Sequence, residues 1–294
     1  MLDGRVVVAR LAVLVGACLL CLTHAWAQTE VRDDTGRPTL FQTPPQRIVS
    51  LLPAITEMVC ELGACERLVG VDRHSNHPAS VRGLPRLGGL EDTPLESLLK
   101  LQPDLVLVAG SARLLPRLQS LGLRVMVFEP RDPQDTERMA RSLSLALTGS
   151  SAAWTAYEQR QQQAWQALTQ RTDPRRAQAA VYVEVGEGPY VASDVSFIGE
   201  GLRRAGLRAA VPGHWGPFPR LSPEWVWRAS PDWIVLGSTA TPVQRRPGWG
   251  QLAAVQAGRV CVLTPEQMDT LVRPGPRLHE GIGAVVSCMQ AKTP

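Results

Sequence analysis

The sequence predicts an α/β protein with two lobes, each built on a mainly parallel sheet, joined by one long and rigid backbone helix. Three features of the chain lead to this prediction. Short apolar segments alternate with amphipathic ones, one helix–strand segment occurs twice, and a long stretch without strand signals separates the two copies. Strands that alternate with helices form parallel sheets covered on both faces.

The N-terminus has the features of an export signal. Arg5 and Arg10 flank an apolar stretch, and Ala25-Trp26-Ala27 follows with the small-x-small pattern of a cleavage site. The apolar run is short for a membrane span and is interrupted by Arg10. We therefore expect residues 1–27 to be a cleaved signal peptide of a periplasmic protein. Lipid attachment at Cys18, which ends a lipobox-like segment, is the alternative.

The composition is that of a globular protein without a nucleic-acid partner. Apolar residues make up 44% of the 294 residues, which is enough for a core. The net charge is only +4, and no block of basic residues stands out. A basic patch of the kind that binds nucleic acid is therefore not expected.

The first lobe is expected over residues 46–131. The segment before it, residues 28–45, is polar and contains three prolines, so we expect a flexible lead-in there. The lobe's strands are predicted at Arg47–Leu52, Leu68–Val71, Asp104–Val108 and Leu123–Phe128, and its helices at Thr56–Leu62, Pro94–Leu101 and Ala112–Leu121.

Residues 132–173 form the predicted helical linker. Within it, Ala152–Arg171 carries one stripe of large side chains at steps of three and four. The stripe consists of Trp154, Tyr157, Gln161, Trp165 and Leu168. At about 1.5 Å per residue this helix would be roughly 30 Å long, the width of a small lobe. We expect it to act as a stiff strut.

The second lobe is expected over residues 174–294, where strands and helices alternate again. Its strands are predicted at Ala179–Val185, Trp233–Leu236 and Val260–Leu263, and its helices at Val195–Ala205, Pro223–Ala229 and Pro276–Met289.

An internal repeat relates the two lobes. Pro94–Gly110 reads PLESLLKLQPDLVLVAG and Ser222–Ser238 reads SPEWVWRASPDWIVLGS. At a constant offset of 128, Glu96 aligns with Glu224, and a Pro-Asp pair and the following strand align as well. The chain therefore contains two copies of one α/β unit, on either side of the long helix. The two acids are either ordinary solvated helix residues or equivalent contacts for two basic sites on a dimeric partner.

Candidate ligand residues lie in loops at the predicted carboxyl ends of the strands, where open parallel sheets bind ligands. The loops hold rings that stack on a flat ligand and arginines that bind carboxylates or amides. The ring residues are His74, His77, Tyr190, His214, Trp215 and Phe218, and the arginines are Arg73, Arg113, Arg220, Arg273 and Arg277. His74 and His77 either share a metal, as imidazoles three residues apart can, or only line the cleft and donate hydrogen bonds.

Four cysteines remain after the signal peptide. An even number in an oxidising compartment permits disulfides, and the pairs would be Cys60–Cys65 and Cys261–Cys288. Free buried cysteines are the alternative. Enzyme motifs are absent: the sequence has no GxxxxGK[ST] loop, no GxSxG elbow and no HExxH helix.

Several segments resemble the periplasmic cobalamin-binding proteins of ABC importers, which are similar to the ferric-siderophore and haem binders. The segments are RIVSLLPAITEMVCELGACERLVGVD, LGGLEDTPLESLLKLQPDLVLV, LSPEWVWRASPDWIVL and VRPGPRL, and the resemblance covers about residues 46–290. It implies two Rossmann-like lobes joined by a rigid helix, no enzymatic activity and no catalytic cofactor. It also implies that Glu96 and Glu224 dock to arginines of a transmembrane permease dimer.

The resemblance implies a ligand site as well, and here the sequence departs from the family. Cobalamin binders carry aromatic rings where this chain has His74, His77 and Leu90, and a tryptophan near Phe218, whereas Arg273 and Arg277 match arginines beside the cleft. We expect a corrinoid ligand, with haem or a ferric siderophore as alternatives. The expected ligand-binding residues are His74, His77, Leu90, Tyr190, Trp215, Phe218, Arg273 and Arg277. Two further alternatives are a bare zinc or manganese binder and an exported α/β enzyme.

Overall fold

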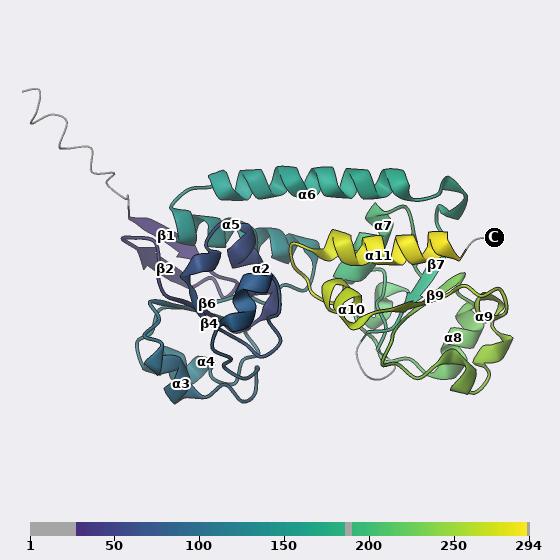
Figure 1. Ribbon diagram of the computed structural model, residues 1–294, viewed down its shortest axis with the longest axis horizontal. Helices are drawn as coiled ribbons and strands as arrows, with labels where there is room; N and C mark the ends of the chain where they lie inside the picture. The colour runs from purple at the N-terminus through teal and green to yellow at the C-terminus, as the bar shows by residue number, and fades with distance from the viewer. Residues whose placement is uncertain (1–27, 186–189, 293–294) are drawn as a thin grey trace, which may run out of the picture.

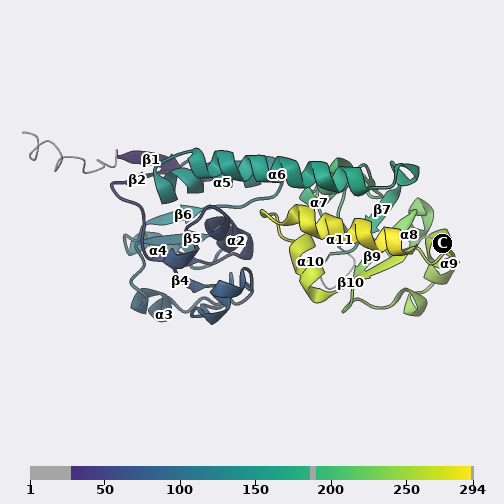
Figure 2. The ribbon, with the colours of Figure 1, turned by 45° about the horizontal axis from the view of Figure 1, so that its top comes forward.

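A computed structural model describes residues 28–185 and 190–292 and shows two lobes bridged by one long helix (Figures 1 and 2). Each lobe has its own four-stranded sheet, and every strand pair within these two sheets is parallel. The two-lobed α/β fold with separate parallel sheets is therefore confirmed. The predicted signal peptide, residues 1–27 with Cys18, lies outside the described residues.

The first lobe is a sheet in the order β4-β3-β5-β6 with helices on both faces. All four residues of β5 are buried, and they alternate between two apolar clusters. Leu105 and Leu107 pack with α2 and α5, whereas Val106 and Val108 pack with α3 and α4. This explains why the strand is continuously apolar. The elements are β3 (Ile48–Ser50), α2 (Pro53–Glu61), β4 (Leu68–Val71), α3 (Leu95–Lys100), β5 (Leu105–Val108), α4 (Leu115–Ser120) and β6 (Val125–Val127).

The second lobe repeats this topology. Its sheet has the order β8-β7-β9-β10, in which each strand takes the place of its counterpart in the first lobe. The strand β8 was not predicted, because its two residues are too few to show alternation. The elements are β7 (Ala180–Val183), α7 (Phe197–Arg204), β8 (Arg208–Ala209), α8 (Pro223–Ala229), β9 (Trp233–Gly237), α9 (Ala253–Gln256), β10 (Val260–Leu263), α10 (Pro265–Leu271) and α11 (Leu278–Ala291).

The internal repeat is visible in the backbone and in its hydrogen bonds. Gln102 and Ser230, at equivalent positions, both take positive φ angles, of 45° and 41°. The carboxylate of Asp104 then accepts backbone N–H groups at the start of β3, and that of Asp232 accepts the N–H of Ala180 at the start of β7. The repeated Pro-Asp pair therefore ties each central strand to its neighbour.

Two helices follow the first lobe's sheet along the chain, and the second of them bridges the lobes. The first, α5 (Pro133–Thr148), begins at the capping carboxylate of Asp132 and ends at Gly149, whose φ of 67° suits glycine. The second, α6 (Ala152–Arg171), has the predicted bounds. Its residues Trp154 and Tyr157 pack into the core of the first lobe, and Leu168 packs into that of the second. One helix thus anchors in both cores, as expected of a strut. No described helix has the length and apolarity needed to cross a bilayer.

The prediction of a flexible lead-in at residues 28–45 is wrong. Two strands, β1 (Thr29–Arg32) and β2 (Pro38–Phe41), form an antiparallel hairpin at the start of the described chain. Val31 and Phe41 are buried in the first lobe's core, and the carboxylate of Asp33 accepts the N–H of Val127 in β6. The polar, proline-containing sequence concealed this hairpin because only two apolar side chains of its strands are buried.

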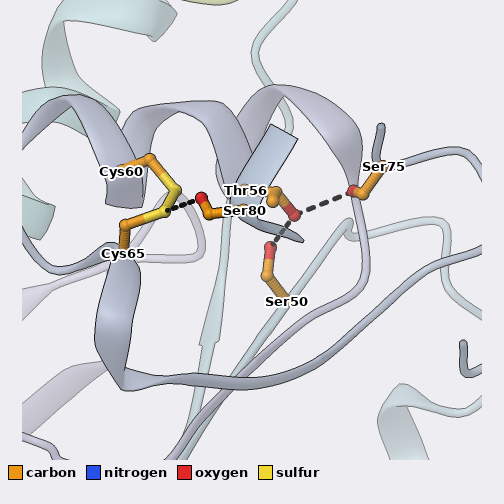
Figure 3. The surroundings of a disulfide bond; sticks show 6 residues. All are labelled: Ser50, Thr56, Cys60, Cys65, Ser75 and Ser80. Atoms are coloured by element: carbon orange, nitrogen blue, oxygen red, sulfur yellow. Dashed lines mark hydrogen bonds between the residues drawn. A yellow bond between two sulfur atoms is a disulfide. The ribbon is translucent and has the colours of Figure 1, made fainter. Parts of the chain in front are cut away.

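Both expected cysteine pairs are joined in the structure. Cys60 and Cys65 link the end of α2 to the short 3₁₀ helix that follows it (Figure 3). Cys261 and Cys288 link β10 to α11. The described 3₁₀ helices are Cys65–Arg67, Ala79–Gly83, Pro174–Arg176, Gly213–Trp215, Val243–Arg245 and Trp249–Gln251.

Candidate functional site

The topology of each lobe marks where a ligand site is expected. The chain runs from β3 to β4 on one side and then crosses to β5 on the other, and β7, β8 and β9 repeat this path. In such sheets ligands bind beyond the carboxyl ends of the strands, at the point where the order reverses. In the first lobe these ends lead into residues 72–78, and in the second the loop after β7 contains residues 186–189, which lie outside the described residues.

Residues 72–78 rest on a chain of buried hydroxyl groups (Figure 3). Thr56 Oγ1 donates to Ser50 Oγ at 2.8 Å and accepts from Ser75 Oγ at 2.9 Å. Ser75 Oγ is also hydrogen-bonded to the buried carboxylate of Asp72. Because burying a polar group costs free energy unless the group is hydrogen-bonded, this series of hydroxyl groups fixes the loop that carries both histidines. The sequence analysis missed it, although Ser50 at the end of β3 and Thr56 within the apolar helix α2 are a usable signal.

The two histidines of this loop have different surroundings. His74 is exposed, and its backbone N–H donates to Asp72 Oδ1 at 2.7 Å. His77 is half-buried, and burial, assisted by the positive charge of Arg277, lowers the pKa of its imidazole. Across the described residues, no group of three or more His, Cys, Asp or Glu side chains is arranged to hold a metal ion. The histidines can therefore contact a chelate or donate hydrogen bonds, but a cage for a bare ion is not formed around them.

Arg273 lies between the lobes and not on an open ligand surface. Its guanidinium donates to Glu57 Oε1 at 2.8 Å, to Asn76 Oδ1 at 2.8 Å and to the carbonyl oxygen of His74 at 3.1 Å, all in the first lobe. It also donates to Asp269 Oδ2 of its own lobe at 2.9 Å. Only 8% of the residue is exposed, and these guanidinium N–H groups donate to other groups of the protein. In this structure Arg273 therefore contacts both lobes, and its binding of ligand stays a prediction.

Glu57 is the first-lobe partner of this contact, and sequence analysis did not identify it. It lies inside α2 among apolar residues, which is an unusual place for a glutamate and the signal that was missed. Burial raises the pKa of its carboxyl group and outweighs the lowering effect of Arg273. Arg277, also expected to bind ligand, has an Nη1 3.7 Å from Glu57 Oε1 and donates to Thr270 and Glu280. Both arginines therefore link the two lobes.

The rings expected in the second lobe divide into free and packed ones. Tyr190 is 47% exposed and Trp215 is 43% exposed, although the ring of Trp215 also packs edge to face with His214 and Trp225, at 4.7 and 5.2 Å between ring centroids. Phe218 is half-buried and packs on Phe197, with 5.4 Å between ring centroids. In the first lobe, Leu90 is half-buried against the apolar cluster of its sheet. The structure thus leaves two of the predicted rings available.

A cavity of about 430 Å³ lies against α6, and the described residues that line it include none of the predicted ligand-binding residues. It is lined by aromatic residues of α6 and by residues of α5, α7 and the α11 region, among them Trp154, Tyr157, Trp165 and Leu278. Sequence analysis did not predict this cavity.

Glu96 and Glu224 lie in the first turns of α3 and α8, and both side chains are exposed. In Figure 1 these helices are on the side of the molecule opposite α6. Hydrogen bonds from Ser222 and from its own backbone lower the pKa of Glu224. Both acids are therefore available to a partner that approaches this side.

Comparison with known proteins places this architecture in a family. The model of the periplasmic binding protein family matches residues 48–267. An uncharacterized ABC transporter substrate-binding lipoprotein of Bacillus subtilis is 26% identical over 86% of this chain and 82% of its own length. A vitamin B12-binding protein of Pectobacterium carotovorum is 25% identical over 85% of this chain and 90% of its own.

Solved structures have the same fold. A periplasmic heme-binding protein in complex with two hemes has a TM-score of 0.71 and 25% identity, covering 85% of this chain and 99% of the other. A periplasmic vitamin B12 binding protein of Vibrio cholerae has a TM-score of 0.67 and 23% identity, covering 85% and 98%. On the strength of the family match over both lobes, this chain belongs to the periplasmic binding protein family.

Proposed function

We propose that this protein is the substrate-binding component of an ABC importer, which captures a corrinoid between its lobes and delivers it to a transmembrane permease. The observation that carries the proposal is the family match across both lobes, residues 48–267. The named relatives are substrate-binding proteins and not enzymes, so this chain is a binding protein and not an enzyme.

The ligand part of the proposal rests on relatives and on the available rings. The vitamin B12-binding relative aligns with 85% of this chain. Tyr190 and Trp215 offer exposed faces in the second lobe, and His74 offers an exposed imidazole in the first. A flat, amphipathic chelate fits such a set because rings stack on its face while polar groups bind its rim.

Haem is the second candidate. The structural similarity to a heme-binding protein and the exposed His74 favour it, because imidazole is a common axial ligand of haem iron. A ferric siderophore is a further alternative. A bare zinc or manganese ion is disfavoured, because no described group of three metal-ligating side chains is present.

We also propose export to the periplasm through cleavage after Ala27, with lipid attachment at Cys18 as the alternative. One relative is a substrate-binding lipoprotein, which supports export of this chain by one route or the other. Mass spectrometry of the protein purified from membranes and from periplasmic extract distinguishes them. A free chain that starts at Gln28 supports cleavage, whereas a chain that starts at a lipid-modified Cys18 supports the anchor.

Titration with candidate ligands tests the function. The purified protein is mixed with cyanocobalamin, haemin and ferric hydroxamate siderophores, and binding is followed by absorption spectroscopy and calorimetry. We expect saturable binding of cyanocobalamin with one site per chain. Tight binding of haemin alone would mean that haem, and not a corrinoid, is the ligand. Binding of none of the three would contradict the proposed ligand class.

A further inference from the structure

Two exposed helix faces carry the same three kinds of side chain in the same order. In α3, Glu96, Leu99 and Lys100 stand at positions i, i+3 and i+4, so they share one face. All three are exposed, and Leu99 is 39% exposed. The intervening Leu98 is fully buried and fixes the helix to the core of the first lobe.

In the second lobe, α8 repeats this arrangement with other residues. Glu224, Trp227 and Arg228 occupy the equivalent positions and are exposed, with Trp227 at 54%. Val226, equivalent to Leu98, is 1% exposed and anchors the helix. Each lobe therefore has an exposed acid, apolar side chain and base on one helix, and in Figure 1 these helices, α3 and α8, lie on the side of the molecule away from α6.

The exposed apolar residues of these two faces recur at equivalent positions of the repeat. Only eight large hydrophobic residues are exposed in the described part of the chain, and two of them fall at equivalent positions of the repeat. They are Leu40, Leu99, Leu121, Tyr190, Val195, Trp215, Trp227 and Val262. Within the described ranges, none of the four charged residues of the two faces forms an ion pair within 4 Å of the kind that Glu137 makes with Arg141, although the positive charge of Arg228 acts on Glu224 and helps to lower its pKa.

We propose that Leu99 and Trp227 are the apolar anchors of a two-point docking surface for the membrane-spanning partner. This inference rests on the proposed function and adds to it. Such a partner must present, at two places, a basic group opposite the glutamate, an apolar hollow opposite the anchor and an acidic group opposite the lysine or arginine. The charges then set register and encounter rate, and the desolvated anchors supply most of the affinity.

The two half-sites contribute unequally. A tryptophan buries more area than a leucine and is the residue type most often found at the energetic centre of an interface. The half-site of the second lobe therefore holds the partner more tightly than that of the first.

Binding to the importer in nanodiscs tests the inference. The importer is the permease–ATPase complex whose transport requires this protein, and binding of the purified full-length protein is measured by surface plasmon resonance. We expect Trp227→Ala to weaken binding about 30-fold and Leu99→Ala about 5-fold. Leu121→Ala, an exposed leucine of the first lobe, and Val262→Ala, an exposed valine of the second, are the matched controls and should change binding less than about twofold.

The outcomes separate this inference from the proposed function. If the unaltered protein does not bind the importer, the proposed function is wrong and the inference with it. If Glu96→Ala with Glu224→Ala abolishes binding while Leu99→Ala with Trp227→Ala leaves it unchanged, the inference is wrong and the proposed function stands. A loss of equal size in the two control variants also overturns the inference. Circular dichroism and ligand titration of every variant confirm that the fold and the cleft are intact.

Discussion

At the level of single residues, the contact between the lobes depends on the ion pair of Glu57 and Arg273. Their side chains are 2% and 9% exposed, so neither charge is solvated if its partner is removed. A buried pair of this kind gives little net stability by itself, but breaking it by removing one partner is costly. The pair therefore specifies how the lobes meet.

Removing Arg273 should destabilise the protein strongly. We expect Arg273→Ala to lower the free energy of unfolding by about 3 kcal/mol, because it leaves the buried carboxylate of Glu57 without its hydrogen-bonded partner and with only Arg277, 3.7 Å away, beside it. The double variant Glu57→Leu with Arg273→Met removes both charges and should recover most of this loss. Urea unfolding of the two variants and the unaltered protein measures the difference. Equal stability of Arg273→Ala and the unaltered protein would show that the pair is solvated.

The imidazole of His279 makes stability depend on pH. Burial lowers the pKa of His279 below its usual 6.5, and the side chain packs against the ring of Trp165. Nearby charges are those of Glu280, Glu61 and Arg277. Because the unfolded chain takes up the proton at a higher pH than the folded chain does, stability is retained above 6.5 and falls as pH drops below it.

Replacing His279 tests this dependence. In His279→Gln the group cannot titrate, so thermal midpoints measured from about pH 7.5 to about pH 5 should decline less than those of the unaltered protein. Parallel decline of the two curves would show that His279 does not contribute.

At the level of elements, the long strut could be predicted because its signal is local. A stripe at steps of three and four defines α6 over its full length, and an Asp cap and a terminal glycine bound α5. The hairpin β1–β2 and the strand β8 could not be predicted in this way, since they are short and are stabilised by contacts with distant residues. Local periodicity identifies long elements, and tertiary contacts create the short ones.

The two disulfides should differ in their contribution to stability. The pair Cys261–Cys288 closes a loop with a sequence separation of 27, and Cys60–Cys65 closes one of 5. In the loop-entropy model, removing the longer link costs about 3.5 kcal/mol and the shorter about 2 kcal/mol. We expect Cys261→Ala with Cys288→Ala to be less stable than Cys60→Ala with Cys65→Ala in urea unfolding. The opposite order would mean that the links act through the folded state.

At the level of the whole molecule, the repeat predicted the duplicated lobes, and the structure carries the duplication further than the sequence indicated. Equivalent strand orders, paired positive φ angles and the same aspartate hydrogen bonds relate the lobes. The interlobe contact of Glu57 and Arg273 could not be predicted, because these residues are 216 positions apart in the chain. For the same reason the contacts of Arg273 with the first lobe were not predicted.

The strut and the interlobe ion pairs together limit how far the lobes can move. The helix α6 is anchored in both cores, and Arg273 and Asn76 join the lobes on the other side. A wide hinge motion would have to break these buried contacts. We therefore expect ligand binding to rotate the lobes by only a few degrees, with the ligand held by residues of both.

A crystal structure of the protein with cyanocobalamin, compared with the ligand-free crystal, tests this account most directly. We predict the ligand between the lobes, in contact with the loop of His74 on one side and with Tyr190 or Trp215 on the other, and a small change in lobe angle. A ligand bound to one lobe alone or in the cavity beside α6, or a large rotation of the lobes, would contradict it.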